Sequence, residues 1–137
     1  MSTNDDGSAV TETVLLIPAL LIVLLFVVFA GRITSADNDV TAAARDGARA
    51  ASRAPSATAS IDAARQTIAM SLTGSHLRCQ TLAIDVDNAG FTSDGNVAVT
   101  IHCDISLADL TGLGVPGVKT LTARAVEVVD RYRGGLP

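Results

Sequence analysis

The feature that most constrains this chain is an uncharged apolar run near its N-terminus. From Thr13 to Gly31 the sequence reads TVLLIPALLIVLLFVVFAG. As a helix this run would be about 28 Å long, which is close to the hydrocarbon thickness of a bilayer, about 30 Å. A helix buried in a soluble core rarely stays apolar on every side over this length. The run therefore predicts one membrane-spanning helix, in which Pro18 is tolerable because membrane helices can re-satisfy backbone groups around a proline.

Two other interpretations of the run are a cleaved secretory signal peptide and a plain membrane anchor. A signal peptide has a basic n-region followed by an apolar stretch of about 7–15 residues. Here the preceding residues, MSTNDDG, contain two Asp and no Lys or Arg, and the apolar run is longer. The signal peptide fits this pattern poorly, whereas the plain anchor stays open.

The residues after the run can form one small domain without a basic surface. Of the 137 residues, those after Gly31 can bury a thin core. The formal net charge is −4, Lys119 is the one lysine, and there is no Trp. Nucleic-acid binding needs clustered positive charge, so this balance argues against a nucleic-acid partner.

The junction before the run carries a charge in an unusual place. Glu12 stands at the start of the run, in the sequence GSAVTE that begins at Gly7. A carboxylate at a helix start suits the macrodipole, yet at the edge of hydrocarbon it is unfavourable without a partner. A Gly, a Glu five residues later and then about 20 apolar residues resembles the processing site of type IV prepilins.

That resemblance implies a specific chemistry at the junction. A membrane-embedded prepilin peptidase would cut between Gly7 and Ser8, which makes Ser8 the new N-terminus and Glu12 the fifth residue. The cut creates an α-amino cation. In a helical assembly, Glu12 of one subunit could neutralise that amine on a neighbour, since opposite charges attract strongly at low dielectric.

Within the prepilin superfamily the chain most resembles the TadE-like pseudopilins of tight-adherence (Flp, type IVc) pilus systems. The resemblance rests on the short leader, the GSAVTE junction, the apolar helix, the stretch TAAARDGARAASRA and the ending VEVVDRYRG. It implies a minor, non-enzymatic pilus-assembly component with three kinds of partner: the prepilin peptidase, pilin and pseudopilin subunits contacted through the N-terminal helix, and the lipid bilayer. The alternative function is an uncleaved, single-pass anchored domain that binds a ligand or an envelope partner outside the cytoplasm.

The resemblance also implies an orientation in the cell membrane. Processing requires the leader on the cytoplasmic side, which places the C-terminal head outside the cytoplasm, with the pilus or cell surface as a further location. Lys and Arg normally mark the cytoplasmic flank, but here the leader has none and Arg32 follows the run directly. The charge pattern thus departs from the family on this point.

The fold class expected is α+β, with a long N-terminal helix (a transmembrane half and an exposed half), a shorter second helix and a small antiparallel sheet of about three strands. The expected organisation is a leader (1–7), a transmembrane helix (8–31), an exposed helical stalk (32–55) and an extracytoplasmic α+β head (56–137). Small apolar residues recur along the stalk at helical spacing. This stripe can pack against neighbouring subunits or receive the head of the same chain; its members are Ile33, Ala36, Val40, Ala43, Ala44, Gly47, Ala48 and Ala51. The second helix is expected from Ala57 to Leu72, with Gly74 as its stop.

Alternating apolar residues predict a hairpin from Thr81–Asp87 and Asn96–Leu107 around the turn NAGFTSDG. Matching the apolar faces places Leu82 opposite Ile101, so that paired numbers sum to 183. Residues 119–132 fit either a helix or a third strand, and the β-branched content favours the strand. The apolar phase shifts at Val126, which would require a bulge.

The two cysteines, Cys79 and Cys103, are a possible disulfide. The expected register places Gln80 opposite Cys103, so a bond requires Cys79 to leave the strand or a bulge to follow it. Two buried thiols are the alternative. An exported domain favours the bond.

No cofactor, metal or catalytic site is predicted. His102 and Cys103 are strand neighbours that point to opposite faces, so they could not share one ion with His76 and Cys79. The stretch from Asp85 to Asn96 matches a calcium loop poorly, since Ala89 occupies a ligand position. No nucleophile stands beside a base and no phosphate-binding loop is present, so the chain is not expected to be an enzyme.

Overall fold

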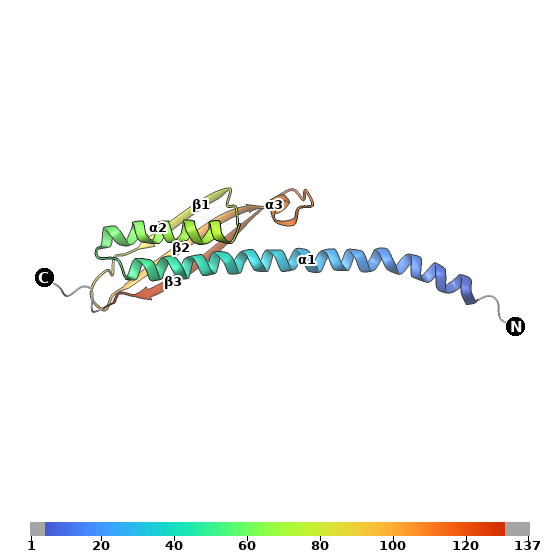
Figure 1. Ribbon diagram of the computed structural model, residues 1–137, viewed down its shortest axis with the longest axis horizontal. Helices are drawn as coiled ribbons and strands as arrows, with labels where there is room; N and C mark the ends of the chain where they lie inside the picture. Colours follow the sequence, from blue (N-terminus) through green and yellow to red (C-terminus); the bar gives the residue numbers. More distant parts are fainter. Residues whose placement is uncertain (1–4, 131–137) are drawn as a thin grey trace. The chain divides into compact units, whose positions relative to one another are not determined.

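The computed structural model describes residues 5–130. In chain order the elements are α1 (Asp5–Ser52), α2 (Ala57–Gly74), β1 (Thr81–Asp87), β2 (Asn96–Ser106), α3 (Leu107–Thr111) and β3 (Val118–Val128). The chain divides into unit 1, Met1–Ile33, and unit 2, Thr34–Pro137. The long first helix, the shorter second helix and the three-stranded antiparallel sheet confirm the predicted α+β class (Figure 1).

In unit 2 the helices lie on one face of the sheet and the core fills the space between them. The stripe of small residues on α1 faces this core: Val40, Ala43, Ala44, Ala48 and Ala51 are all 0% exposed. They belong to one buried cluster with Ile68 of α2 and the inward face of β2. The structure confirms that the stripe receives the chain's own head, and these side chains are covered within the monomer.

Gly47 lets α1 and α2 approach closely. A Cβ at this position would lie 2.6 Å from Cγ1 and 2.7 Å from Cδ1 of Ile68. Carbon atoms pack best at about 3.5–4.0 Å, so no larger residue fits without moving α2. The glycine is thus a packing requirement in the middle of a helix.

Both ends of α2 are capped by local hydrogen bonds. The Ser56 hydroxyl accepts a bond from the Ala59 amide at 3.2 Å, as an N-cap should. At the other end the helix extends to Gly74, two residues further than expected. The left-handed residue there is His76, with φ 60°, and not Gly74. The amides of His76 and Leu77 bond back to Thr73 and Leu72, which is the Schellman pattern with His76 at C′.

The sheet is a meander with β2 in the centre, in the order β1-β2-β3. The inward residues of β2 were predicted correctly, and Val97, Val99, Ile101, Cys103 and Ile105 are all buried. The register was wrong by two residues: Leu82 lies opposite Cys103 and Ile84 opposite Ile101, so paired numbers sum to 185. A two-residue shift preserves both faces, which is why apolar phase alone could not detect it.

The turn between β1 and β2 explains the register. A Cβ on Gly95 would overlap the carbonyl oxygen of Gly90. The backbone therefore crosses at Gly90 and Gly95, and only glycine fits at position 95. Asp94 has a positive φ of 71°, which turns the chain sharply before Gly95. Because this crossing occupies the turn, pairing of β1 with β2 begins at Asp87 and Ala98, and not at Asp87 and Asn96.

Residues 118–128 form a strand that pairs with β2 without a bulge. The described part of the predicted segment ends at Asp130, so its last two positions lie outside the described residues. The expected bulge at Val126 was wrong: Val126 and Val128 are 52% and 64% exposed on the face away from the helices. The core phase continues instead through Ala125 to buried Val129.

Candidate functional site

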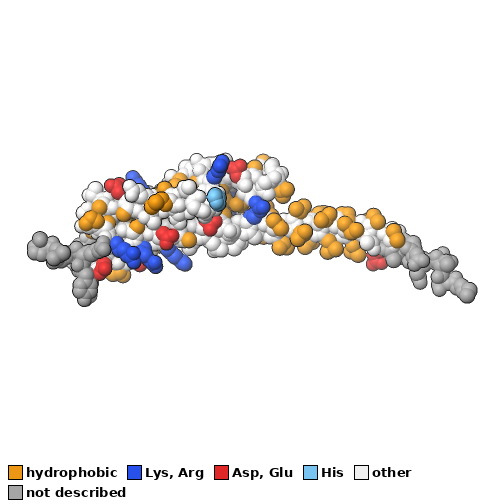
Figure 2. Space-filling view, viewed as in Figure 1, with side chains coloured by type: hydrophobic (Ala, Val, Ile, Leu, Met, Phe, Trp, Pro, Cys, Tyr) orange, Lys and Arg blue, Asp and Glu red, His pale blue; other side chains and the backbone are white. Residues whose placement is uncertain are grey.

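The apolar run lies in the first half of α1. Its large side chains, from Val10 to Val28, are between 48% and 72% exposed. In Figure 2 most of the coloured side chains of unit 1 are hydrophobic, whereas unit 2 has a mixed, charged surface. Among the described residues one helix, Val10–Ser52, is long and apolar enough to cross a membrane. This helix suggests a single-pass membrane anchor, and it continues through Pro18.

The residues of the predicted processing junction lie on the same helix. Gly7, Ser8 and Glu12 all fall within α1, which begins at Asp5, and residues 1–4 of the leader lie outside the described residues. Ser8 and Glu12 are four residues apart, which is about one turn of helix. The Glu12 side chain is exposed. The geometry places a carboxylate one turn from the position where proteolysis would create an amine.

The two cysteines are bonded in the structure. The sulfur atoms of Cys79 and Cys103 lie 2.00 Å apart, and their Cα atoms 5.3 Å apart. β1 begins at Thr81, so Cys79 lies outside the strand, and Leu82 takes the place opposite Cys103 that Gln80 was expected to fill. The bond ties the end of the α2–β1 connection to the centre of the sheet.

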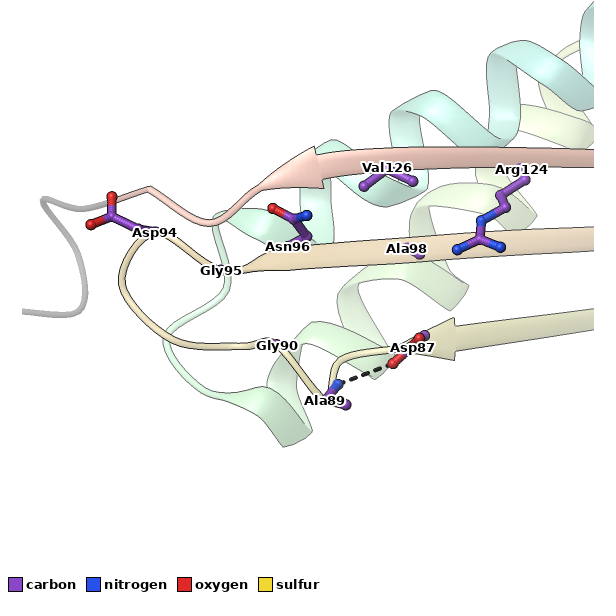
Figure 3. A pocket seen from close by; sticks show the side chains of 9 residues that line it. All are labelled: Asp87, Ala89, Gly90, Asp94, Gly95, Asn96, Ala98, Arg124 and Val126. Carbon is purple, nitrogen blue, oxygen red and sulfur yellow. Dashed lines mark hydrogen bonds between the residues drawn. The ribbon is translucent and has the colours of Figure 1, made fainter.

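A shallow depression of about 350 Å³ lies on the open face of the sheet, beside the turn between β1 and β2 (Figure 3). Its charged side chains are Asp87 and Arg124, from two different strands with Ala98 between them, and Asp94 from the turn. The Asp87 carboxylate accepts a bond from the Ala89 amide at 3.2 Å. The depression is open and carries both charge signs, so it has no donor set typical of a cofactor site.

The residues considered for metal binding do not converge. Asn88 turns its amide away from the turn and donates to the Ala57 carbonyl at 2.7 Å. Within residues 5–130 no three His, Cys, Asp or Glu side chains are placed to hold a metal ion. His102 instead contacts the Thr122 hydroxyl at 3.0 Å across the open face of the sheet.

The comparison with protein families matches nearly all of α1. Residues 7–49 match the model of the family described as TadE-like protein. This segment is TadE-like. The match confirms the resemblance inferred from the sequence, and it begins at Gly7, the residue of the predicted junction. No curated protein and no solved structure matched the chain.

The TadE-like segment contains the whole apolar run and most of the buried stripe on α1. The apolar helix in this segment fits membrane anchoring. Residues 50–137, which include the sheet, lie outside the match.

Sequence analysis missed α3 and its apolar surroundings. The signal was present as Ser106 followed three residues later by Asp109, the spacing of a capping box. The Ser106 hydroxyl accepts from the Asp109 amide at 3.5 Å, and Gly112 ends the helix with φ 67°. The loop that follows exposes Leu113 by 60% and leads to Val118, which is 58% exposed.

Proposed function

We propose that this chain is a minor TadE-like pseudopilin of a tight-adherence (Flp, type IVc) pilus system. It is made as a precursor, cut between Gly7 and Ser8 by a prepilin peptidase and assembled with pilin subunits through α1. The observation that carries the proposal is the TadE-like match, which starts at Gly7 and covers the apolar run.

The burial of the stripe favours the first half of α1 as the assembly surface. Residues such as Ala44 and Ala48 are covered by the chain's own sheet and α2, so they cannot pack against a second subunit. The large side chains from Val14 to Val28 are exposed and apolar on every side of the helix. This segment is soluble only in lipid or in a bundle of similar helices.

Glu12 has a defined role in this proposal. Hydrolysis of the Gly7–Ser8 bond leaves a carboxylate on Gly7 and a protonated amine on Ser8. That cation would sit at the positive end of the α1 macrodipole, which disfavours it. A carboxylate from Glu12 of a neighbouring subunit offsets the cation, and each charge then has a partner in the apolar bundle.

The disulfide supports a head outside the cytoplasm. Disulfides persist in oxidising compartments and are rare where glutathione keeps thiols reduced. The Cys79–Cys103 bond therefore favours an extracytoplasmic unit 2 and a leader on the cytoplasmic side of the membrane.

Intact mass of the protein purified from membranes of a strain with an active prepilin peptidase tests the processing step. We expect loss of Met1–Gly7, and we expect Gly7→Ala to retain the leader. Gly31→Ala is the matched control, because Gly31 lies on the same helix and no atom would lie within 4 Å of its new Cβ. A full-length wild-type chain in that strain would reject processing and favour an anchored binding domain.

Removal of the Glu12 charge tests the assembly step separately. We expect Glu12→Gln to be processed normally but to be lost from the pilus-assembly complex recovered by co-purification. Asp37→Asn removes an exposed carboxylate further along α1 and should assemble like the wild type. Equal recovery of Glu12→Gln and wild type would show that the carboxylate has no pairing role.

A further inference from the structure

Within unit 2, α3 lies at the same end as the first residues of α1 that belong to this unit. Asn88 follows Asp87, which pairs with Ala98 near the start of β2, and it donates a hydrogen bond to Ala57 in the first turn of α2. β2 and α2 therefore begin at the same end of unit 2. From Ala98 to Ser106 β2 rises about 27 Å, and the 18 residues of α2 also rise about 27 Å. The far end of β2, where α3 begins, therefore lies level with the C-terminus of α2.

The first helix of unit 2 reaches the same end. α1 and α2 are joined by the short connection 53–56, and Gly47 packs against Ile68, so the two helices run antiparallel. From Ser52 back to Thr34, α1 also spans about 28 Å. Within unit 2, Figure 1 shows α3 at the end opposite the α1–α2 connection, which is the end where Thr34 begins the unit.

Chain connectivity brings this end close to the apolar run. The run stops at Gly31, and three residues of chain reach at most about 11 Å, so Thr34 cannot lie further than that from the end of the run. The polar zone on each side of a bilayer is about 5–8 Å deep. If the run spans the hydrocarbon, the end of unit 2 that holds Thr34 lies at the membrane surface, whichever way the chain is oriented.

The segment Leu107–Val118, here called the α3 loop, has the composition of an interfacial contact. Its sequence LADLTGLGVPGV contains a single charge, Asp109, and Lys119 follows it directly. Leu113 and Val118 are about three-fifths exposed, while Thr111 is buried and its hydroxyl donates to the Leu107 carbonyl within the loop. Such exposed apolar side chains lose contact with water when they enter a lipid interface.

We propose that the α3 loop is a second membrane contact, with Leu113 and Val118 inserted at the headgroup–acyl boundary of the bilayer in which α1 is anchored. This inference rests on the membrane anchoring in the proposed function but not on processing or on the direction of insertion. This second contact holds unit 2 at the bilayer surface before assembly.

The absence of Trp from the sequence makes a direct test available. Single tryptophans are introduced into the full chain by Leu113→Trp, Val118→Trp and Val128→Trp, and each variant is reconstituted into lipid vesicles. Val128 is the matched control, because it is an apolar residue 64% exposed at the opposite end of unit 2. Phe26→Trp, within the run, reports the anchor itself.

Emission is measured with lipids that carry a quencher just below the headgroup and, separately, with aqueous acrylamide. We expect Leu113→Trp and Val118→Trp to show a blue shift, quenching by the lipid and protection from acrylamide, and Val128→Trp to show the reverse. Circular dichroism confirms that each variant keeps its fold. Because two loop positions are tested, the experiment can still be read if one of the two variants does not fold.

The other outcomes overturn the inference in distinguishable ways. If Phe26→Trp is quenched by lipid but both loop variants respond only to acrylamide, the loop lies in water and only the anchor stands. If the loop variants are shielded from both quenchers, protein covers the loop. If Phe26→Trp is not quenched by lipid, the anchor is refuted, and the loop contact with it.

Discussion

The contact between Gly47 and Ile68 gives a quantitative test of the helix pairing. Gly→Ala in a helix interior normally stabilises by about 1 kcal/mol. At Gly47 the new Cβ would lie 2.6 Å from Ile68 Cγ1, about 1 Å too close, and Ile68 is 0% exposed with a stiff β-branched side chain. Overpacking of this kind costs about 1–3 kcal/mol, so we expect Gly47→Ala to destabilise unit 2 by about 1 kcal/mol.

The effect of Gly47→Ala on the free energy of unfolding should change sign when its clash with Ile68 is removed. Ile68→Ala alone should cost about 2–5 kcal/mol through the cavity it leaves. In that background Gly47→Ala meets no ethyl group and should stabilise by about 1 kcal/mol, which gives a coupling energy of roughly 2 kcal/mol between the two sites. The free energy of unfolding is measured by urea titration of the full chain in detergent, followed by circular dichroism.

Gly74→Ala is the matched control for this cycle. Gly74 is the last residue of α2, its φ is not positive, and no atom would lie within 4 Å of its Cβ. This substitution should stabilise by about 0.4–1 kcal/mol. If Gly47→Ala stabilises as much as Gly74→Ala does, α2 does not pack against α1 as described and the reasoning is refuted.

Three further predictions use the same urea titration. His76→Gly should stabilise by up to about 1 kcal/mol, because His76 has φ 60° where glycine is unstrained, and an unchanged midpoint would show that the Schellman turn is absent. Reduction of the Cys79–Cys103 bond, which closes 24 residues, should cost about 3 kcal/mol, and a reductant-insensitive midpoint would contradict the bond. Asn88→Ala should cost about 1 kcal/mol and speed amide exchange in the first turn of α2, since it removes the bond to Ala57; unaltered exchange there would show that the turn is not tethered.

The sequence was sufficient to predict elements and faces because these depend on local periodicity. The spacing of Val40, Ala44 and Ala48 identified the inward face of α1, and the alternation from Val97 to Ile105 identified that of β2. The apolar run was evident from its length and lack of charge. The TadE-like junction could be recognised from the spacing of Gly7 and Glu12.

Features set by non-local packing could not be predicted in this way. The pairing of Leu82 with Cys103 depends on how Gly90 and Gly95 cross in the turn, and the crossing leaves no periodic signal. Val126 was assigned to the core because exposed valines and buried ones look alike in sequence; only its place on the open face distinguishes them. The left-handed residue after α2 is His76, whereas Gly74, two residues earlier, was the expected stop.

The buried stripe and the apolar run impose opposite rules on two halves of one helix. Between Val14 and Val28 any bulky hydrocarbon side chain should serve, but a charge should be rejected. From Val40 to Ala51 the limit is volume, because the inward positions have room only for small groups, while charges at the intervening outward positions are harmless. Natural substitutions in α1 should therefore differ on the two sides of Thr34. Before Thr34 they should change the size of the side chain but keep it apolar. After Thr34 they should change the polarity of outward side chains but keep inward side chains small.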